Sequence, residues 1–267
     1  MTVVLAATHH DPDGRLYTQM VRIFPALRDL FTGIAILLTP TSVPATREWL
    51  AQAGITLQVG SADEPIGHLH LGRWRRGAVH IALNAFPNAE WFLFCDLDRV
   101  LHWMEYWPDE LAATLQALPA ADITVLGRTA RALASHPRAQ AATEAIVNEV
   151  FARMTGQVWD VMAAARGLSR RAAELITATS RDDSIGADCT WLWLAQQAGL
   201  RLTYRATEGL EFETLDRYAD EVAALGGAQA WLDRFDADLR NWLMRMDLAR
   251  AVIAALNEAS ANKYNEG

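Results

Sequence analysis

Short apolar runs of strand length alternate along the first half of the chain with segments whose apolar residues recur every three or four positions. This alternation predicts successive β-α-β units. Prolines and acidic residues mark helix starts between the runs, for example Pro44 and Pro108, as expected for the first turn of a helix. The predicted strands are Val3–Ala7, Ile34–Leu38, Ile55–Val59, Trp91–Cys95 and Ile123–Leu126.

Most of the predicted strands read as continuous apolar runs, which is typical of a mostly parallel sheet covered by helices on both faces. In such sheets ligands bind beyond the carboxyl ends of the strands. The residues that follow the first and fourth runs are polar, namely Thr8-His9-His10-Asp11 and Asp96-Leu97-Asp98. We therefore expect the functional site at this edge of an α/β domain.

The C-terminal part of the chain has a different pattern. Apolar residues recur at helical spacing from Trp231 to Leu256 and give one continuous apolar face. We expect a catalytic domain over residues 1–210 and a helical extension over residues 211–260. Packing of the extension on the main domain is one interpretation, and a homodimer interface is the other.

Composition and charge exclude several classes of protein. The chain has 24 basic and 32 acidic residues and a net charge of −8, which argues against binding of duplex nucleic acid. Its two cysteines, Cys95 and Cys189, indicate neither a disulfide framework nor a zinc cluster. No apolar run approaches the roughly 20 residues of a membrane span, and we read no signal peptide. The cytoplasm is the expected compartment.

The Asp-x-Asp triplet at Asp96 and Asp98 is the most informative local pattern. The sequence contains two other such triplets, but only this one directly follows a strand of buried type. Hard divalent cations bind through one or two carboxylates together with substrate phosphates. The triplet therefore predicts a Mg²⁺ or Mn²⁺ site. The alternative is that both aspartates cap the following turn or helix.

The segment Glu90–Asp98 resembles the Asp-x-Asp signature of GT-A glycosyltransferases. Further along, Ala187-Asp188-Cys189-Thr190, a helix, and the strand-like Gly199–Tyr204 resemble family-2-like members. The resemblance implies a GT-A type, mixed and mostly parallel sheet flanked by helices. It also implies a nucleotide-sugar donor, Mn²⁺ or Mg²⁺ held by Asp96 and Asp98, and Asp188 as the catalytic base of an inverting reaction.

Other residues are candidates for binding the donor. The exit of the first strand is where GT-A enzymes bind the base and ribose, and arginines can bind a diphosphate through their forked donors. Arg75 and Arg171 belong to the two basic segments considered, although arginines on helices are more often solvated or paired. The donor candidates, besides Asp96, are Thr8, His9, Asp11, Arg73, Arg76 and Arg170.

On the acceptor side, Asp182 and Asp183 compete with Asp188 for the role of base. They lie in the segment Thr179–Gly186, which we expect to act as a mobile lid. Asp188 could instead be a helix N-cap. We expect a carbohydrate or another small hydroxyl acceptor, because tryptophans such as Trp74, Trp103, Trp107 and Trp159 can stack on sugars, although most tryptophans are packing residues.

Two other functions compete with sugar transfer. A nucleotidyltransferase that makes a nucleotide-sugar could share the sheet and the aspartates. It would be expected to carry a glycine-rich basic loop after the first strand, whereas Thr8–Leu16 contains one glycine, Gly14. A non-catalytic nucleotide-sugar-binding protein is the other alternative, and the joint presence of Asp96, Asp98 and Asp188 argues against it.

Overall fold

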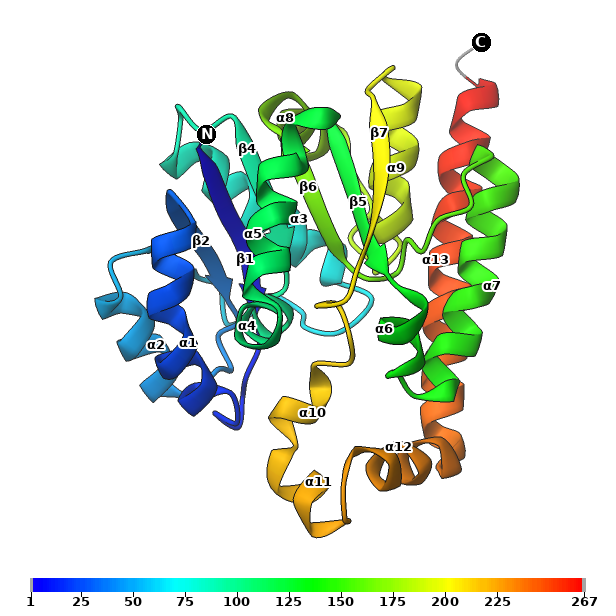
Figure 1. Ribbon diagram of the computed structural model, residues 1–267. Helices are drawn as coiled ribbons and strands as arrows, with labels where there is room; N and C mark the ends of the chain where they lie inside the picture. Colours follow the sequence, from blue (N-terminus) through cyan, green and yellow to red (C-terminus); the bar gives the residue numbers. More distant parts are fainter. Residues whose placement is uncertain (1, 266–267) are drawn as a thin grey trace.

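The computed structural model describes residues 2–265 and shows one seven-stranded sheet in the order β3-β2-β1-β4-β6-β5-β7 (Figure 1). Every strand except β6 runs in the same direction. The mixed, mostly parallel sheet flanked by helices is therefore confirmed. The strands are β1 Val3–His9, β2 Gly33–Leu38, β3 Thr56–Val59, β4 Trp91–Cys95, β5 Ile123–Arg128, β6 Ala165–Ser169 and β7 Leu202–Thr207.

Strand β6 is the element that the apolar pattern did not predict. It lies between β4 and β5 and is antiparallel to both. Its run is short and is interrupted by Arg166 and Gly167, so it lacks the continuous apolar character of the other central strands. Gly167 allows close packing, because a Cβ there would lie 2.2 Å from the side chain of Leu118.

Helices cover both faces of the sheet, and alternate residues of each strand point to opposite layers. Burial of each Phe or Leu in these layers contributes about 1.5–3 kcal/mol. One face packs against α1 Tyr17–Leu30, α2 Pro44–Gln52, α4 Leu97–Tyr106 and α5 Pro108–Ala117. The other face packs against α3 Leu71–Ala85, α7 Arg138–Thr155, α8 Arg170–Thr179 and α9 Ala187–Gln197.

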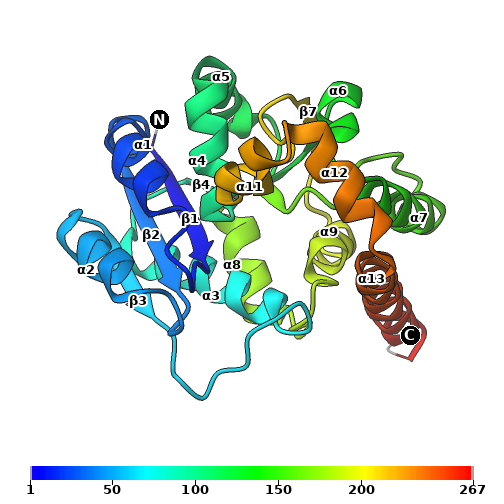
Figure 2. The same ribbon diagram turned by 90° about the horizontal axis from the view of Figure 1, so that it is seen from below.

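The remaining elements are short. Two flank β5, namely η1 Leu118–Ala120 before it and α6 Ala130–Ala134 after it, and three follow β7, namely α10 Thr214–Arg217, α11 Ala219–Ala224 and α12 Ala228–Ala237. The chain then forms α13 Leu239–Asn265, which packs on α7 and α9. Figures 1 and 2 show α10 and α11 beneath the carboxyl ends of β1 and β4, so this segment covers the sheet edge at which we expect the site.

The C-terminal apolar face is divided between two helices, because the backbone becomes extended at Asp238. Within α13, Leu248, Val252 and Leu256 are buried, while Leu239 and Leu243 are 73% and 67% exposed. Packing on the main domain therefore accounts for part of this face. A homodimer interface over the exposed part stays a prediction.

Two of the tryptophans considered for sugar stacking, Trp74 and Trp103, are buried in the core. Their indole N–H groups donate to Pro65 O and to Glu110 Oε2, respectively. Both are packing residues. Within residues 2–265, no helix combines the length and the apolar character needed to cross a bilayer.

Candidate active site

Asp96 lies where β4 ends and α4 begins. It occupies the N-cap position, but its carboxylate makes no capping hydrogen bond to the helix. Instead, Oδ1 accepts a 2.5 Å hydrogen bond from the Thr8 hydroxyl on β1, and Oδ2 accepts one of 2.8 Å from Arg75 Nη2 on α3. Burial alone would raise the pKa of Asp96, but the charge of Arg75 and the Thr8 hydrogen bond outweigh it, so the pKa is lowered. The capping alternative therefore does not describe this carboxylate.

Asp188 reaches the same guanidinium from the other side. It lies in the first turn of α9, where Gly186 is the N-cap, and its carboxylate does not cap the helix. Its Oδ1 accepts a 2.6 Å hydrogen bond from Arg75 Nη1, and both side chains are only 5% exposed. Burial raises the pKa of Asp188, although Arg75 and Arg166 oppose the shift. Arg75 thus joins the two aspartates that the sequence placed in one site.

Arg166 on β6 holds the backbone of Asp188 in place. The sequence analysis did not identify this residue. The side chain is buried, and Nη2 donates to the main-chain oxygens of Asp188 and Val161. Burial lowers the pKa of Arg166. An arginine within a short, otherwise apolar segment was the available signal, because a buried charge requires partners. Arg166 fixes the first turn of α9 on the sheet.

Asp98, the second acid of the triplet, has different partners. Oδ1 accepts from the backbone N–H of Arg99, and Oδ2 accepts a 3.2 Å hydrogen bond from Arg217 Nη2. Arg217 also donates to the main-chain oxygen of His10 at 3.0 Å. Because Arg217 belongs to α10, the C-terminal segment completes this part of the site.

The three residues at the exit of β1 that we expected to bind the nucleotide-sugar donor, Thr8, His9 and Asp11, have different environments. Thr8 contacts Asp96, as described. His9 is buried, its Nε2 has no hydrogen-bond partner within residues 2–265, and burial lowers its pKa to about 4. Asp11 accepts hydrogen bonds from the backbone N–H groups of Arg15 and Leu16 and so stabilises the turn before α1.

Arg75 is the residue of the basic segment on α3 that contacts Asp96. Arg73 pairs with Glu64, with 2.9 Å between Nη2 and Oε1. Arg76 donates to Asp182 O and to Asp183 Oδ1. The structure thus does not bring Arg73 and Arg76 to Asp96.

The segment expected to form a lid is fixed on its neighbours by many contacts. Both Asp182 carboxylate oxygens accept hydrogen bonds, Oδ1 from the Ser184 hydroxyl and backbone N–H and Oδ2 from the Thr190 hydroxyl. The Ile185 N–H donates to His68 O. Asp182 and Asp183, the rival bases, are therefore engaged in holding this segment in place.

Arg170 lies at the opposite edge of the sheet from Asp96. Because β6 is antiparallel to β4, Ser169 pairs with Trp91, the first residue of β4. Arg170 donates to the main-chain oxygens of Ala89 and Phe86, at 2.8 and 2.6 Å. The structure therefore does not bring Arg170 to Asp96, because the reversed direction of β6 places this residue at the other edge of the sheet.

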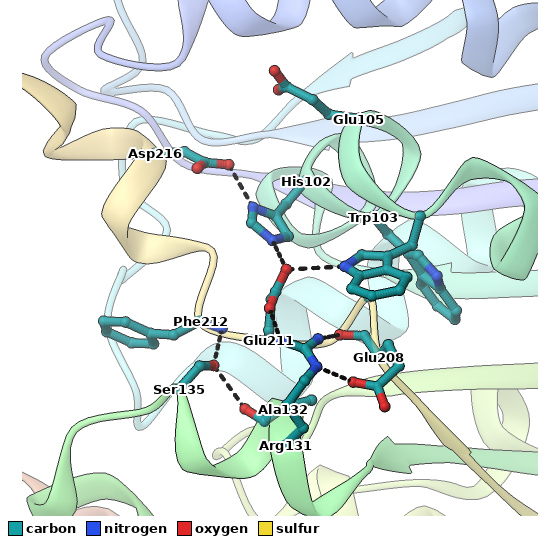
Figure 3. A network of polar contacts seen from close by, with 12 residues as sticks. His102, Trp103, Glu105, Arg131, Ala132, Ser135, Glu208, Glu211, Phe212 and Asp216 are labelled. Atoms are coloured by element: carbon teal, nitrogen blue, oxygen red, sulfur yellow. Dashed lines mark hydrogen bonds and ion pairs between the residues drawn. The ribbon is translucent and has the colours of Figure 1, made fainter. Parts of the chain in front are cut away.

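A second polar cluster, which no local pattern of residues indicated, holds the segment after β7 against α4. His102 lies between Asp216, 2.7 Å from Nδ1, and Glu211, 3.2 Å from Nε2 (Figure 3). Burial alone would lower the pKa of His102, but its contacts with Asp216 and Glu211 outweigh it and raise the pKa. Arg131 on α6 binds Glu211 and Glu208. This cluster positions α10, and with it Arg217.

The carboxylates of Asp96 and Asp98 fit a divalent cation that is also bound by a substrate. Asp96 and Asp98 are 18% and 28% exposed at the same sheet edge, and each of their carboxylate oxygens accepts a hydrogen bond but keeps a further lone pair for a cation. Among the residues that the structure describes, no group of three or more His, Cys, Asp or Glu side chains could hold a metal. Two carboxylates suffice where phosphate oxygens complete the coordination, as Mg²⁺ sites often show.

A cavity of about 1090 Å³ lies away from this site. It lies between the segment 179–184, the face of α9 that carries Thr190 and Trp193, and α13. A cavity of about 280 Å³ lies beside α3 and is lined by Arg73, Arg76 and Gln58, among others. We place the site at Asp96 because bridged, buried charges converge there, whereas cavity volume alone does not indicate chemistry.

No protein-family model matches the sequence, and a search of curated proteins finds no match. Solved structures are similar in fold. Glucosyl-3-phosphoglycerate synthase from Mycobacterium tuberculosis, in complex with Mn²⁺, UDP and phosphoglyceric acid, matches with a TM-score of 0.52 and 14% identity over 97% of this chain and 78% of that chain.

The same enzyme with Mn²⁺, UDP-glucose and glycerol 3-phosphate gives a TM-score of 0.51 at 14% identity, over 97% of this chain and 79% of that chain. Its complex with Mg²⁺ and UDP gives a TM-score of 0.50 at 15% identity, over 76% of this chain and 68% of that chain. At these identities the similarity concerns the fold. The chain therefore has the GT-A fold of nucleotide-sugar glycosyltransferases.

Proposed function

We propose that this protein is a metal-assisted glycosyltransferase that moves a sugar from a nucleotide-diphosphate sugar to a hydroxyl acceptor with inversion. The observation that carries the proposal is the buried bridge from Asp96 through Arg75 to Asp188. In a GT-A fold, Asp96 is expected to face the sugar donor and Asp188 the acceptor. Both aspartates contact the Arg75 guanidinium.

On the donor side, Asp96 and Asp98 would hold Mn²⁺ or Mg²⁺ against the diphosphate. The cation would stabilise the negative charge that grows on the leaving nucleoside diphosphate. Thr8 fixes one oxygen of Asp96, and Arg75 fixes the other, so this carboxylate is preorganised. His9, buried and uncharged near neutral pH because its pKa is lowered, lies at the end of β1 beside the proposed nucleotide site.

On the acceptor side, Asp188 is the proposed base that takes the proton of the attacking hydroxyl. Its raised pKa makes the carboxylate more basic, as this role requires. Arg75 binds Oδ1, and Oδ2 makes no hydrogen bond to the described residues. The second oxygen is therefore the one that we assign to the acceptor. The acceptor class is a carbohydrate or another small hydroxyl compound.

A ligand panel tests the proposal directly. Nucleoside diphosphates and UDP-sugars are added to the protein with and without Mn²⁺, and the melting temperature is measured. Ligand at about 100 times its Kd adds about 2.7 kcal/mol of stability, which raises the melting temperature by about 5 °C or more in a chain of this size. UDP is the first probe, because the structural neighbours contain it. If no nucleotide shifts the transition, the proposed function is wrong.

A further inference from the structure

Arg217 donates a hydrogen bond to one oxygen of Asp98, a carboxylate to which we assign the metal. Its Nη2 lies 3.2 Å from Asp98 Oδ2, and its Nη1 lies 3.0 Å from the main-chain oxygen of His10. The Arg217 and Asp98 side chains are 20% and 28% exposed, so solutes can reach both. The second contact is with a neutral carbonyl, and Arg217 therefore loses little by exchanging it for an anion.

The segment that carries Arg217 is anchored independently of Asp98. The neighbouring residue, Asp216, binds His102 on α4 (Figure 3). It also accepts a 2.6 Å hydrogen bond from Gln19 on α1. On the following helix, Glu221 pairs with Arg15. These contacts hold the backbone in place, so the Arg217 side chain can change partner without movement of the segment as a whole.

We propose that Arg217 exchanges partners during donor binding, from the Asp98 carboxylate to the donor diphosphate. This inference rests on the proposed function. A cation on Asp98 would repel the Arg217 guanidinium, which is partly exposed and free to leave. Arg75, in contrast, stays on Asp96 because it is buried between Asp96 and Asp188. The released guanidinium remains next to the bound nucleotide, and its forked donors match phosphate oxygens. Arg217 is thus a competitor of the free cation and a ligand of the diphosphate.

This double role predicts effects of opposite sign when Arg217 is removed. Without the competing guanidinium, Asp98 should bind Mn²⁺ alone more tightly, by about fivefold, as expected for loss of one unit of charge repulsion near the surface. UDP in the presence of saturating Mn²⁺ should bind about tenfold more weakly, because one charge-assisted hydrogen bond is lost. A residue that only supports the fold would weaken both.

The experiment compares Arg217→Gln with the wild-type protein and with Arg15→Gln. Arg15 pairs with Glu221 and lies over the Tyr218 ring in the same region, but it does not contact Asp98. Mn²⁺ binding without nucleotide is measured by electron paramagnetic resonance of the free ion, and UDP binding by calorimetry. Far-ultraviolet circular dichroism checks that each variant is folded, and Arg217→Lys, which keeps the charge, provides a second variant.

Tighter Mn²⁺ binding together with weaker UDP binding in Arg217→Gln supports the exchange, provided that Arg15→Gln behaves as wild type. Unchanged affinities, or weaker binding of both ligands, overturn it while the proposed function stands. If Arg217→Gln does not fold, Arg217→Lys decides: because Lys lacks the forked donors, weaker UDP binding with retained Mn²⁺ affinity supports the exchange, and unchanged affinities or joint loss in that variant overturn it. A wild-type protein that binds neither Mn²⁺ nor UDP overturns the proposed function as well.

Discussion

Arg75 and Asp188, which are 113 positions apart in the sequence, form an almost completely buried ion pair with 2.6 Å between Nη1 and Oδ1. The second nitrogen of the same guanidinium binds Asp96. Burial would lower the pKa of Arg75, but the two carboxylates outweigh it and raise the pKa, so the cation is permanent. The relative position of the two aspartates is therefore set by one rigid, planar group.

Removal of this cation should destabilise the protein strongly. In Arg75→Met the side chain keeps much of its volume, but Asp96 and Asp188 lose their buried counter-charge, at a cost of about 3–5 kcal/mol. Arg73→Met is the matched control, because the exposed pair with Glu64 contributes about 0–1 kcal/mol. Urea denaturation followed by tryptophan fluorescence measures both. Similar small losses in the two variants would show that the bridge is not important for stability.

Loss of Asp98 should remove the metal dependence of nucleotide binding. We expect Asp98→Ala to fold normally, because the residue lies at the sheet edge and not in the core, and to bind UDP equally with and without Mn²⁺. Calorimetric titration measures the affinity under both conditions. Asp13→Ala, from another Asp-x-Asp triplet, is the control and should retain the metal response. An intact Mn²⁺ effect in Asp98→Ala would contradict the donor-site assignment.

Replacement of Asp188 separates acceptor chemistry from donor binding. Asp188→Asn keeps an oxygen for Arg75 but cannot accept a proton, so sugar transfer should fall by about 10²–10⁴ while UDP affinity stays close to wild type. The rate is measured as UDP released at saturating donor in the presence of a true acceptor. Transfer at the wild-type rate would mean that another group is the base, and complete loss of UDP binding would place Asp188 in the donor site.

The contact of His102 with Asp216 predicts that stability depends on pH. The pKa of His102 is raised above 6.5 in the folded state, so protonation favours folding. Its contribution is complete below pH 6.5 and is lost as the pH rises through the folded-state pKa. The free energy of unfolding, measured from pH 6 to 9, should therefore fall less in His102→Gln than in the wild type. Parallel curves for the two proteins would contradict this role.

The sequence by itself determined the layered fold and the position of its main carboxylate pair. Strand β4 has the bounds that the apolar run from Trp91 to Cys95 indicated, because a strand buried on both faces must be continuously apolar. The same strand places Asp96 and Asp98 at the carboxyl edge of the sheet. These inferences succeeded because they depend on local pattern and on strand direction alone.

Only the tertiary structure decided which side chains complete the site. The antiparallel direction of β6 places Arg170 at the far edge of the sheet, and the pairing of strands distant in sequence determines that direction. The choice of Arg75 over Arg73 and Arg76 depends on which face of α3 packs against the sheet. Arg217 approaches Asp98 because the chain returns beneath β1 and β4 after β7. Ion pairs between such distant segments follow from how the helices pack, and no local pattern of residues records that packing.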